Sequence, residues 1–180
     1  IAQVYRAKLR RDGIEQDVAV KVLHPSIQRK INRDLSLMQR MASLAHLIPS
    51  DMIRMINLPK ATENFTDVMR RQLDLNIEGQ NLNTFRQHFK DFHRIGFPVP
   101  IIADTNCLVE SYEGNVPITT FLSDDSEEGV ALRRKLAGPL LRAFLKMVFI
   151  DNFIHCDLHP GNVLVQTNSN QKDGHKIVFL

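Results

Sequence analysis

Apolar and polar residues alternate along the first two dozen positions, which is typical of half-buried β-strands. Two strands are predicted, over residues 2–9 and 18–23, with a turn around residues 11–13 between them. The second strand carries Lys21, which follows three small apolar residues. The chain is therefore predicted to open with a hairpin that presents one lysine.

After this hairpin, apolar residues recur at spacings of three and four, which predicts amphipathic helices. Helices are expected over residues 31–45, 61–89 and 131–149. We expect the second helix to break, if anywhere, at Asn76 or Gly79. The buried face of the third is predicted to consist of Leu136, Leu140, Leu141, Phe144, Leu145 and Val148.

Shorter apolar runs predict further strands. One covers residues 107–112 and runs into a turn at 113–115, which we interpret as a hinge. A second hairpin is predicted from a strand at 163–165, a polar turn at 167–174 and a closing strand from Lys176. No internal repeat is visible along the chain.

The composition is that of a globular protein. Of the 180 residues, 43% are apolar and 24% are charged, which excludes intrinsic disorder and suffices for one compact body or a small two-lobed one. The net charge is +3, and the basic residues are spread along the chain without interleaved aromatic residues, so no nucleic acid is expected as a partner. Two cysteines make no disulfide framework and favour a reducing compartment.

The densest cluster of chemically reactive side chains is the run 155–162, His-Cys-Asp-Leu-His-Pro-Gly-Asn. Pro160 prevents a continuing helix, so a loop is predicted. Asp157 and Asn162 can converge on a metal ion bound to a phosphate: a carboxylate accepts the proton of an incoming hydroxyl, and an amide oxygen ligates Mg²⁺ without adding negative charge. Their spacing equals that in the catalytic loop of protein kinases.

Two other interpretations of this run stay open. Asp157 and Asn162 could cap and close a turn without any chemistry. His155 and His159 are four residues apart, as in a zinc-binding helix, but Pro160 interrupts such a helix. We expect instead that one histidine hydrogen-bonds within the loop and orients the aspartate.

Lys21 is the second candidate for phosphate chemistry. A lysine ammonium is a compact point charge suited to the α- and β-phosphates of a nucleotide, and it needs a carboxylate to hold it. Glu78 on the second predicted helix is the candidate, and Asp74, four residues earlier, would project from the same face. Such strands often end in an ordinary surface lysine; the downstream Asp157 and Asn162 favour phosphate binding.

Four stretches together resemble the UbiB-type, AarF-domain atypical kinases: residues 1–7 (IAQVYRA), 18–25 (VAVKVLHP), 73–81 (LDLNIEGQN) and 155–162 (HCDLHPGN). The similarity spans essentially the whole chain, and residues 71–75 and 149–153 most resemble a mitochondrial branch of the family. The resemblance implies a truncated α+β, protein-kinase-like two-lobed fold. It places a small lobe with an antiparallel sheet and inserted helices at residues 1–112, and part of a helical large lobe at 113–180.

The resemblance also implies binding of ATP or ADP with Mg²⁺, phosphoryl transfer in the full-length protein, residence in mitochondria and a role in ubiquinone biosynthesis or lipid metabolism. Lipid or ubiquinone-pathway proteins are implied as partners, with membrane association through segments outside this chain. The positions that match the family's functional residues are Lys21 (phosphates), Glu78 (its helix partner), Asp157 (catalytic), Asn162 (metal ligand), and the hinge residues Glu110, Ser111 and Tyr112, whose backbone would meet adenine.

The chain also departs from the family pattern. Gln72 stands where the family has the glutamate of a Glu-x-Asp pair. The family's alanine-rich loop would precede Ile1, and its Asp-Phe-Gly-like motif would follow Leu180, so we read the chain as an excerpt and expect it to be inactive alone. Two rival functions stay open: a nucleotide-sensing pseudokinase, and a small-molecule phosphotransferase of the aminoglycoside or choline kinase type, whose loop has the same pattern.

Overall fold

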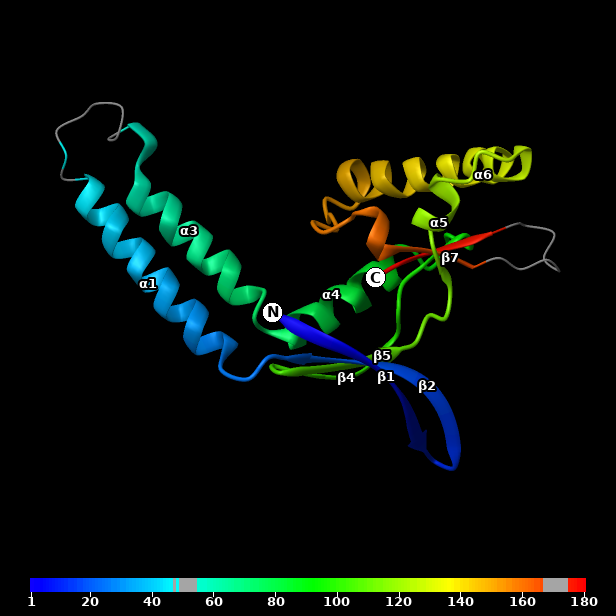
Figure 1. Cartoon of the computed structure of the whole chain (residues 1–180), viewed down its shortest axis with the longest axis horizontal. Helices are drawn as coiled ribbons and strands as arrows, with labels where there is room; N and C mark the ends of the chain where they lie inside the picture. The colour runs from blue at the N-terminus through cyan, green and yellow to red at the C-terminus, as the bar shows by residue number, and fades with distance from the viewer. Residues whose placement is uncertain (47, 49–54, 167–174) are drawn as a thin grey trace. The chain divides into compact units, whose positions relative to one another are not determined.

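The computed structural model describes residues 1–46, 48, 55–166 and 175–180, and the polar turn predicted at 167–174 lies outside this part of the chain. The described residues form two compact units (Figure 1). The first unit comprises residues 1–80 and 101–109, and the second comprises 81–100 and 110–180. The lobe boundary after residue 112 stays a prediction.

The first unit opens with the predicted hairpin. Strands β1 (Ala2–Arg11) and β2 (Ile14–Leu23) pair antiparallel, and a two-residue turn at Asp12 and Gly13 joins them. Both turn residues have positive φ values, 53° and 80°, as a tight hairpin of this hand requires. The strands are longer than predicted because the tight turn lets the hydrogen-bonded ladder continue into exposed positions. At those positions no buried face requires apolar and polar residues to alternate, so the sequence pattern did not include them.

Two more strands complete the sheet of this unit. They are β4 (Pro100–Asp104) and β5 (Cys107–Ser111), and the strand order is β1-β2-β5-β4. The backbone N–H of Leu23 donates to the carbonyl oxygen of Asn106, which ties the end of β2 to the turn before β5. The buried apolar residues of this unit are Val18, Leu23, Leu35, Ala42, Leu73, Leu75, Leu108 and Val109.

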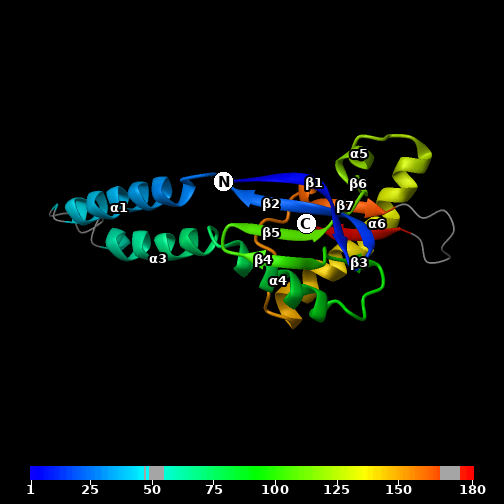
Figure 2. The same cartoon turned by 90° about the horizontal axis from the view of Figure 1, so that it is seen from below.

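Helices α1 (Ile27–His46) and α3 (Leu58–Arg71) run side by side in both views (Figures 1 and 2). The side chain of Asn57 caps α3 by accepting a hydrogen bond from the Lys60 N–H, and Pro59 lies in the first turn, where its missing donor costs nothing. Helix α1 confirms the helix expected over residues 31–45. Helix α3 packs along it.

The helix predicted over residues 61–89 is two helices, and the predicted break points were wrong. The chain leaves the helix at residues 72–74 and α4 (Leu75–His88) starts anew. Buried Leu73 and a hydrogen bond from the Leu75 N–H to the Thr105 carbonyl oxygen stop α3 at this point. The Asp74 carboxylate accepts from the Asn76 N–H, so Asp74 starts α4 and does not share a helix face with Glu78.

The second unit is built around a four-stranded sheet of order β3-β8-β7-β6. Its strands are β3 (Ile95–Gly96), β6 (Val116–Pro117), β7 (Val163–Gln166) and β8 (Lys176–Phe179). The β7–β8 hairpin is antiparallel as predicted, whereas β3 pairs parallel with β8. Its helical elements are α5 (Thr119–Leu122), α6 (Glu127–Leu145), a π turn at Lys146–Ile150 and a 3₁₀ turn at Pro160–Asn162.

The predicted buried face of α6 was only partly right. Leu136 is buried, but the other buried residues of this stretch are Pro139, Ala143 and Met147. Leu141, Phe144 and Leu145 are 59%, 46% and 41% exposed. Apolar residues lie almost all around this helix, so periodicity did not single out the face that packs. No helix in the described part of the chain is long and apolar enough to cross a bilayer.

Candidate active site

Lys21 and Glu78 meet in the first unit. The Lys21 ammonium Nζ donates to both carboxylate oxygens of Glu78, at 2.7 and 2.8 Å, across 57 positions of sequence. The two side chains are 30% and 39% exposed, so the pair is shielded on one side and open to solvent on the other. An ammonium held this way is oriented yet accessible to a second anionic group.

Local structure explains why the two residues face each other. Lys21 lies near the end of β2, opposite Val4 in the ladder. Glu78 lies in the first turn of α4, where the helix dipole favours a carboxylate. The start of α4 is fixed by the Asp74 cap and by the contact of Leu75 with Thr105, so the register that aims Glu78 at Lys21 depends on the helix break.

The run 155–162 is a loop, as predicted. The His159 ring nitrogen Nδ1 accepts from the Gly161 N–H at 3.0 Å, so one histidine does hydrogen-bond within the loop. The aspartate, however, is held by Asn162, whose side-chain Nδ2 donates to the Asp157 backbone oxygen (2.9 Å) and carboxylate Oδ2 (3.1 Å). The Asn162 backbone is in turn held by Leu180, whose N–H donates to its carbonyl oxygen.

The Asn162 side chain contacts Asp157 through its amide nitrogen. Because Nδ2 of Asn162 bonds to Asp157, the amide oxygen of Asn162 is turned away from that contact. Asp157 is exposed, so its carboxylate is accessible to a ligand. One carboxylate and one amide oxygen are a donor set that fits Mg²⁺, which takes few protein ligands and completes its shell with phosphates and water.

No cluster of three or more histidine, cysteine, aspartate or glutamate side chains suited to a metal ion occurs among the described residues.

Ser111 of the predicted hinge is hydrogen-bonded to Val99 and Glu113. The Ser111 N–H donates to the Val99 carbonyl oxygen, and the Val99 N–H donates to the Ser111 hydroxyl, each at 2.9 Å. The same hydroxyl donates to Glu113.

Sequence reasoning missed two charged residues of the second unit. Lys146 and Asp151 form a nearly buried ion pair directly before the loop. The sequence does contain a signal for it, because a lysine and an aspartate five residues apart lie in an otherwise apolar run. An α-helical period places those two positions on different faces, so the pairing was not predicted.

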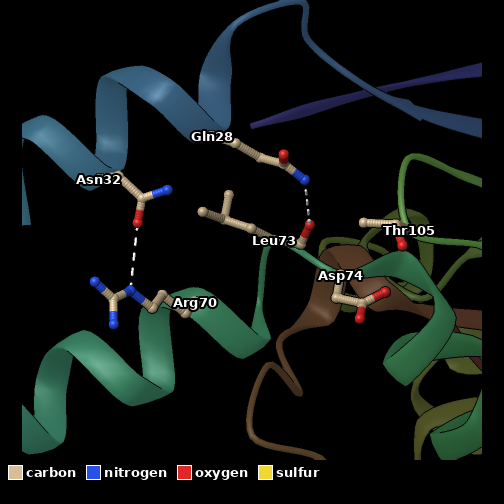
Figure 3. A pocket seen from close by; sticks show the side chains of 6 residues that line it. All are labelled: Gln28, Asn32, Arg70, Leu73, Asp74 and Thr105. Carbon is tan, nitrogen blue, oxygen red and sulfur yellow. Dashed lines mark hydrogen bonds between the residues drawn. The ribbon is translucent and has the colours of Figure 1, made fainter.

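A separate open pocket of about 500 Å³ lies beside the α3–α4 break (Figure 3). Its polar side chains bond across the helices: Arg70 donates to Asn32, and Gln28 donates to the Leu73 carbonyl oxygen. Asp74 lines it, whereas neither Lys21 nor Glu78 is among the described residues that do so. The pocket is therefore distinct from the Lys21–Glu78 pair.

Comparison with known proteins agrees with these features. The model of the ABC1 atypical kinase-like domain matches residues 1–180. The mitochondrial ABC1 family protein YPL109C of Saccharomyces cerevisiae is 33% identical over 193 residues, covering 99% of this chain and 29% of that protein. "Probable protein kinase UbiB" of Histophilus somni is 30% identical over 168 residues, covering 92% of this chain and 30% of that protein.

A solved structure has the same fold. It is described as "The complex structure of Rv3197-erythromycin from Mycobacterium tuberculosis" and superposes with a TM-score of 0.72 at 26% identity, over 99% of this chain and 42% of that one. The predicted α+β kinase-like fold is thereby confirmed. The chain spans less than a third of the length of the two curated relatives. It belongs to the ABC1 atypical kinase-like family, which includes the UbiB and AarF proteins.

Proposed function

We propose that this chain is the nucleotide-binding part of an atypical kinase or ATPase that uses ATP with Mg²⁺. The observation that carries the proposal is the Lys21–Glu78 pair, in which two residues 57 positions apart form a two-oxygen contact that stays open to solvent. Family membership and the Asp157–Asn162 contact support the same function.

Each predicted site residue has a role in this proposal. Glu78 orients the Lys21 ammonium, which binds the α- and β-phosphates. Asp157 accepts the proton of the attacking hydroxyl, and Asn162 holds Asp157 while its amide oxygen ligates Mg²⁺. The metal neutralises charge on the phosphates when bound. For adenine, we propose the backbone groups of the hinge residues Glu110, Ser111 and Tyr112, as the family resemblance implies; the Ser111 N–H pairs with the Val99 carbonyl oxygen in this structure.

The biological setting is proposed from the relatives. Two of them bear the names of a mitochondrial ABC1 family protein and of UbiB, which supports residence in mitochondria and work in ubiquinone or lipid metabolism. The expected result is that the full-length protein fractionates with mitochondria and that its loss lowers ubiquinone or alters mitochondrial lipids. Unchanged levels of both in cells lacking the protein would contradict this setting.

Nucleotide binding is tested with the full-length protein by calorimetry, with and without Mg²⁺. Lys21→Met removes the phosphate-binding charge and is expected to weaken ATP binding by at least about tenfold. Lys8→Met is the matched control, because Lys8 lies on the same hairpin in an exposed pair with Glu15. Equal ATP affinity in the two variants would contradict the role of Lys21.

Phosphoryl transfer is tested by ADP release. Asp157→Asn keeps the shape of the side chain but removes the base, so turnover should fall by about 10² to 10⁴ while nucleotide binding is retained. Full turnover in this variant would remove Asp157 from the proposed mechanism.

The same measurements separate the rival functions. A nucleotide sensor would bind ATP through Lys21 but release no ADP in the wild-type protein. A small-molecule phosphotransferase would release ADP faster when an amino alcohol or aminoglycoside is added. Because the solved relative forms a complex with erythromycin, that compound belongs among the acceptors tested.

A further inference from the structure

Lys146 and Asp151 form a nearly buried ion pair in the second unit. The Lys146 ammonium donates to both carboxylate oxygens of Asp151, at 2.5 and 2.6 Å, and the side chains are only 13% and 9% exposed. The ammonium also lies 5.0 Å from the ring centre of Phe89 and 5.8 Å from that of Phe92. His88 approaches the same carboxylate at 3.6 Å. A charged pair in such surroundings is costly to bury and is retained only if its geometry is good.

The backbone creates this pair by a π turn. The Asp151 N–H donates to the carbonyl oxygen of Lys146, five residues earlier. In an α-helix, side chains five residues apart are about 140° apart around the axis and do not meet. Wider π turns occur frequently at functional sites. The ion pair and the π turn therefore stabilise each other at the point where the helical segment ends.

A segment without regular secondary structure leads from this pair to the loop, and Asn152 within it has a positive φ of 47°. Its exposure alternates residue by residue: positions 151, 153 and 155 are half-buried, and 152, 154 and 156 are exposed. The Phe153 N–H donates to the Met147 carbonyl oxygen at 3.0 Å. Asp151, Phe153 and His155, at alternate positions, are the half-buried residues of this segment, and we call them its anchors.

The two later anchors are aromatic. The rings of Phe153 and His155 lie 4.6 and 5.7 Å from the ring of Phe85 on α4. Phe97 also stacks on Phe85, with ring centres 5.0 Å apart and an angle of 11° between the rings. His155 is the last anchored residue before exposed Asp157, so the direction in which the loop leaves the helix is set by these contacts.

We propose that Asp151 is a positioning residue, which acts through its ion pair with Lys146 to hold the segment that presents Asp157. This inference rests on the proposed function of Asp157. It assigns to the Lys146–Asp151 pair a role in the geometry of the loop, beyond a contribution to stability.

The test uses the full-length protein and the variants Asp151→Asn, Lys146→Met and their double mutant, with Lys8→Met as a control at an exposed ion pair. We expect each single variant to lower kcat by roughly 10- to 100-fold while the nucleotide Kd changes by less than about twofold. Hydrogen exchange should accelerate at residues 153–158 and stay unchanged in α1. Lys146→Arg keeps the charge and should retain most of the turnover.

The double mutant distinguishes positioning from mere stability. It removes both charges, so thermal stability should return toward that of the wild type because no buried charge is left unpaired. Turnover should stay low, since the anchor at Asp151 is still missing. Recovery of both stability and turnover would overturn the proposal, as would wild-type turnover in the single variants while Asp157→Asn is inactive.

If Asp157→Asn retains full turnover, the proposed function fails. The hydrogen-exchange measurement alone then tests whether the Lys146–Asp151 pair holds the segment. Faster exchange confined to residues 153–158 in the single variants would then still support the anchoring role of the pair. Unchanged exchange there would overturn it.

Discussion

The Lys21–Glu78 pair is poorly suited to stabilising the fold. Both side chains are about a third exposed, and ion pairs in such settings contribute roughly 0 to 1 kcal/mol. The Lys146–Asp151 pair is different, because removing one partner of a buried pair leaves an uncompensated charge. Variants at Lys21 therefore report on ligand binding, whereas variants at Lys146 also need a measurement of stability.

His175 provides a prediction at the residue scale. Burial, followed by the positive charges of Lys135 and Arg94, lowers the pKa of His175 below its ordinary value of 6.5. The unfolded chain therefore binds more protons than the folded one between these two pKa values, and stability falls as the pH drops below about 6.5. Nuclear magnetic resonance titration of the His175 ring should give a midpoint below 6.5.

Lys135→Met tests the electrostatic part of this shift. Removing the lysine charge should raise the pKa of His175 toward its ordinary value and reduce the loss of stability in acid. A midpoint at or above 6.5 in the unmodified protein would show that burial and charge do not act on His175 as described.

At the scale of elements, the start of α6 depends on a glycine. The Ser126 hydroxyl accepts from the Gly129 N–H at 3.1 Å, which caps the helix. A Cβ atom at Gly129 would clash with the backbone oxygen of Asp124 and lie 2.5 Å from its carboxylate carbon. Gly129→Ala should therefore lower the free energy of unfolding by about 1 to 3 kcal/mol, measured by denaturant titration.

Gly96→Ala is the matched control. Its new Cβ atom would approach Cε of Lys176 at 2.7 Å, but this is the far end of a flexible side chain that can move away. We expect a change of less than about 0.5 kcal/mol. Similar losses in both variants would mean that the backbone contact at Asp124 is not what makes Gly129 necessary.

Elements with local signals were predictable. The β1–β2 hairpin follows from alternation and from a turn at Asp12 and Gly13, whose conformational preferences act within four residues. The break at residues 72–74 was not predictable, because it depends on burial of Leu73 and on a contact with Thr105, some thirty residues away. Helix periodicity continues through such a break, since it records apolar spacing and not tertiary contacts.

At the scale of the whole molecule, nucleotide binding should raise the free energy of unfolding of the protein. A ligand that binds only the folded protein stabilises it by about 2.7 kcal/mol at a concentration 100 times its Kd. Thermal unfolding of the full-length protein should therefore shift upward with ATP and Mg²⁺, and the shift should be much smaller for Lys21→Met at the same concentration. An equal shift in both proteins would place the nucleotide away from Lys21.

The sequence alone was enough to predict the residue types of the candidate site and their spacing within each motif. Lys21 lies in a run with a strand pattern, and Asp157 and Asn162 lie within one proline-containing loop. The role of Asp74 at the start of α4, the packed face of α6, and the pairing of Lys146 with Asp151 all required folded coordinates. Propensity and turn chemistry act over a few neighbouring residues, whereas these contacts depend on how separate segments pack, which no local pattern encodes.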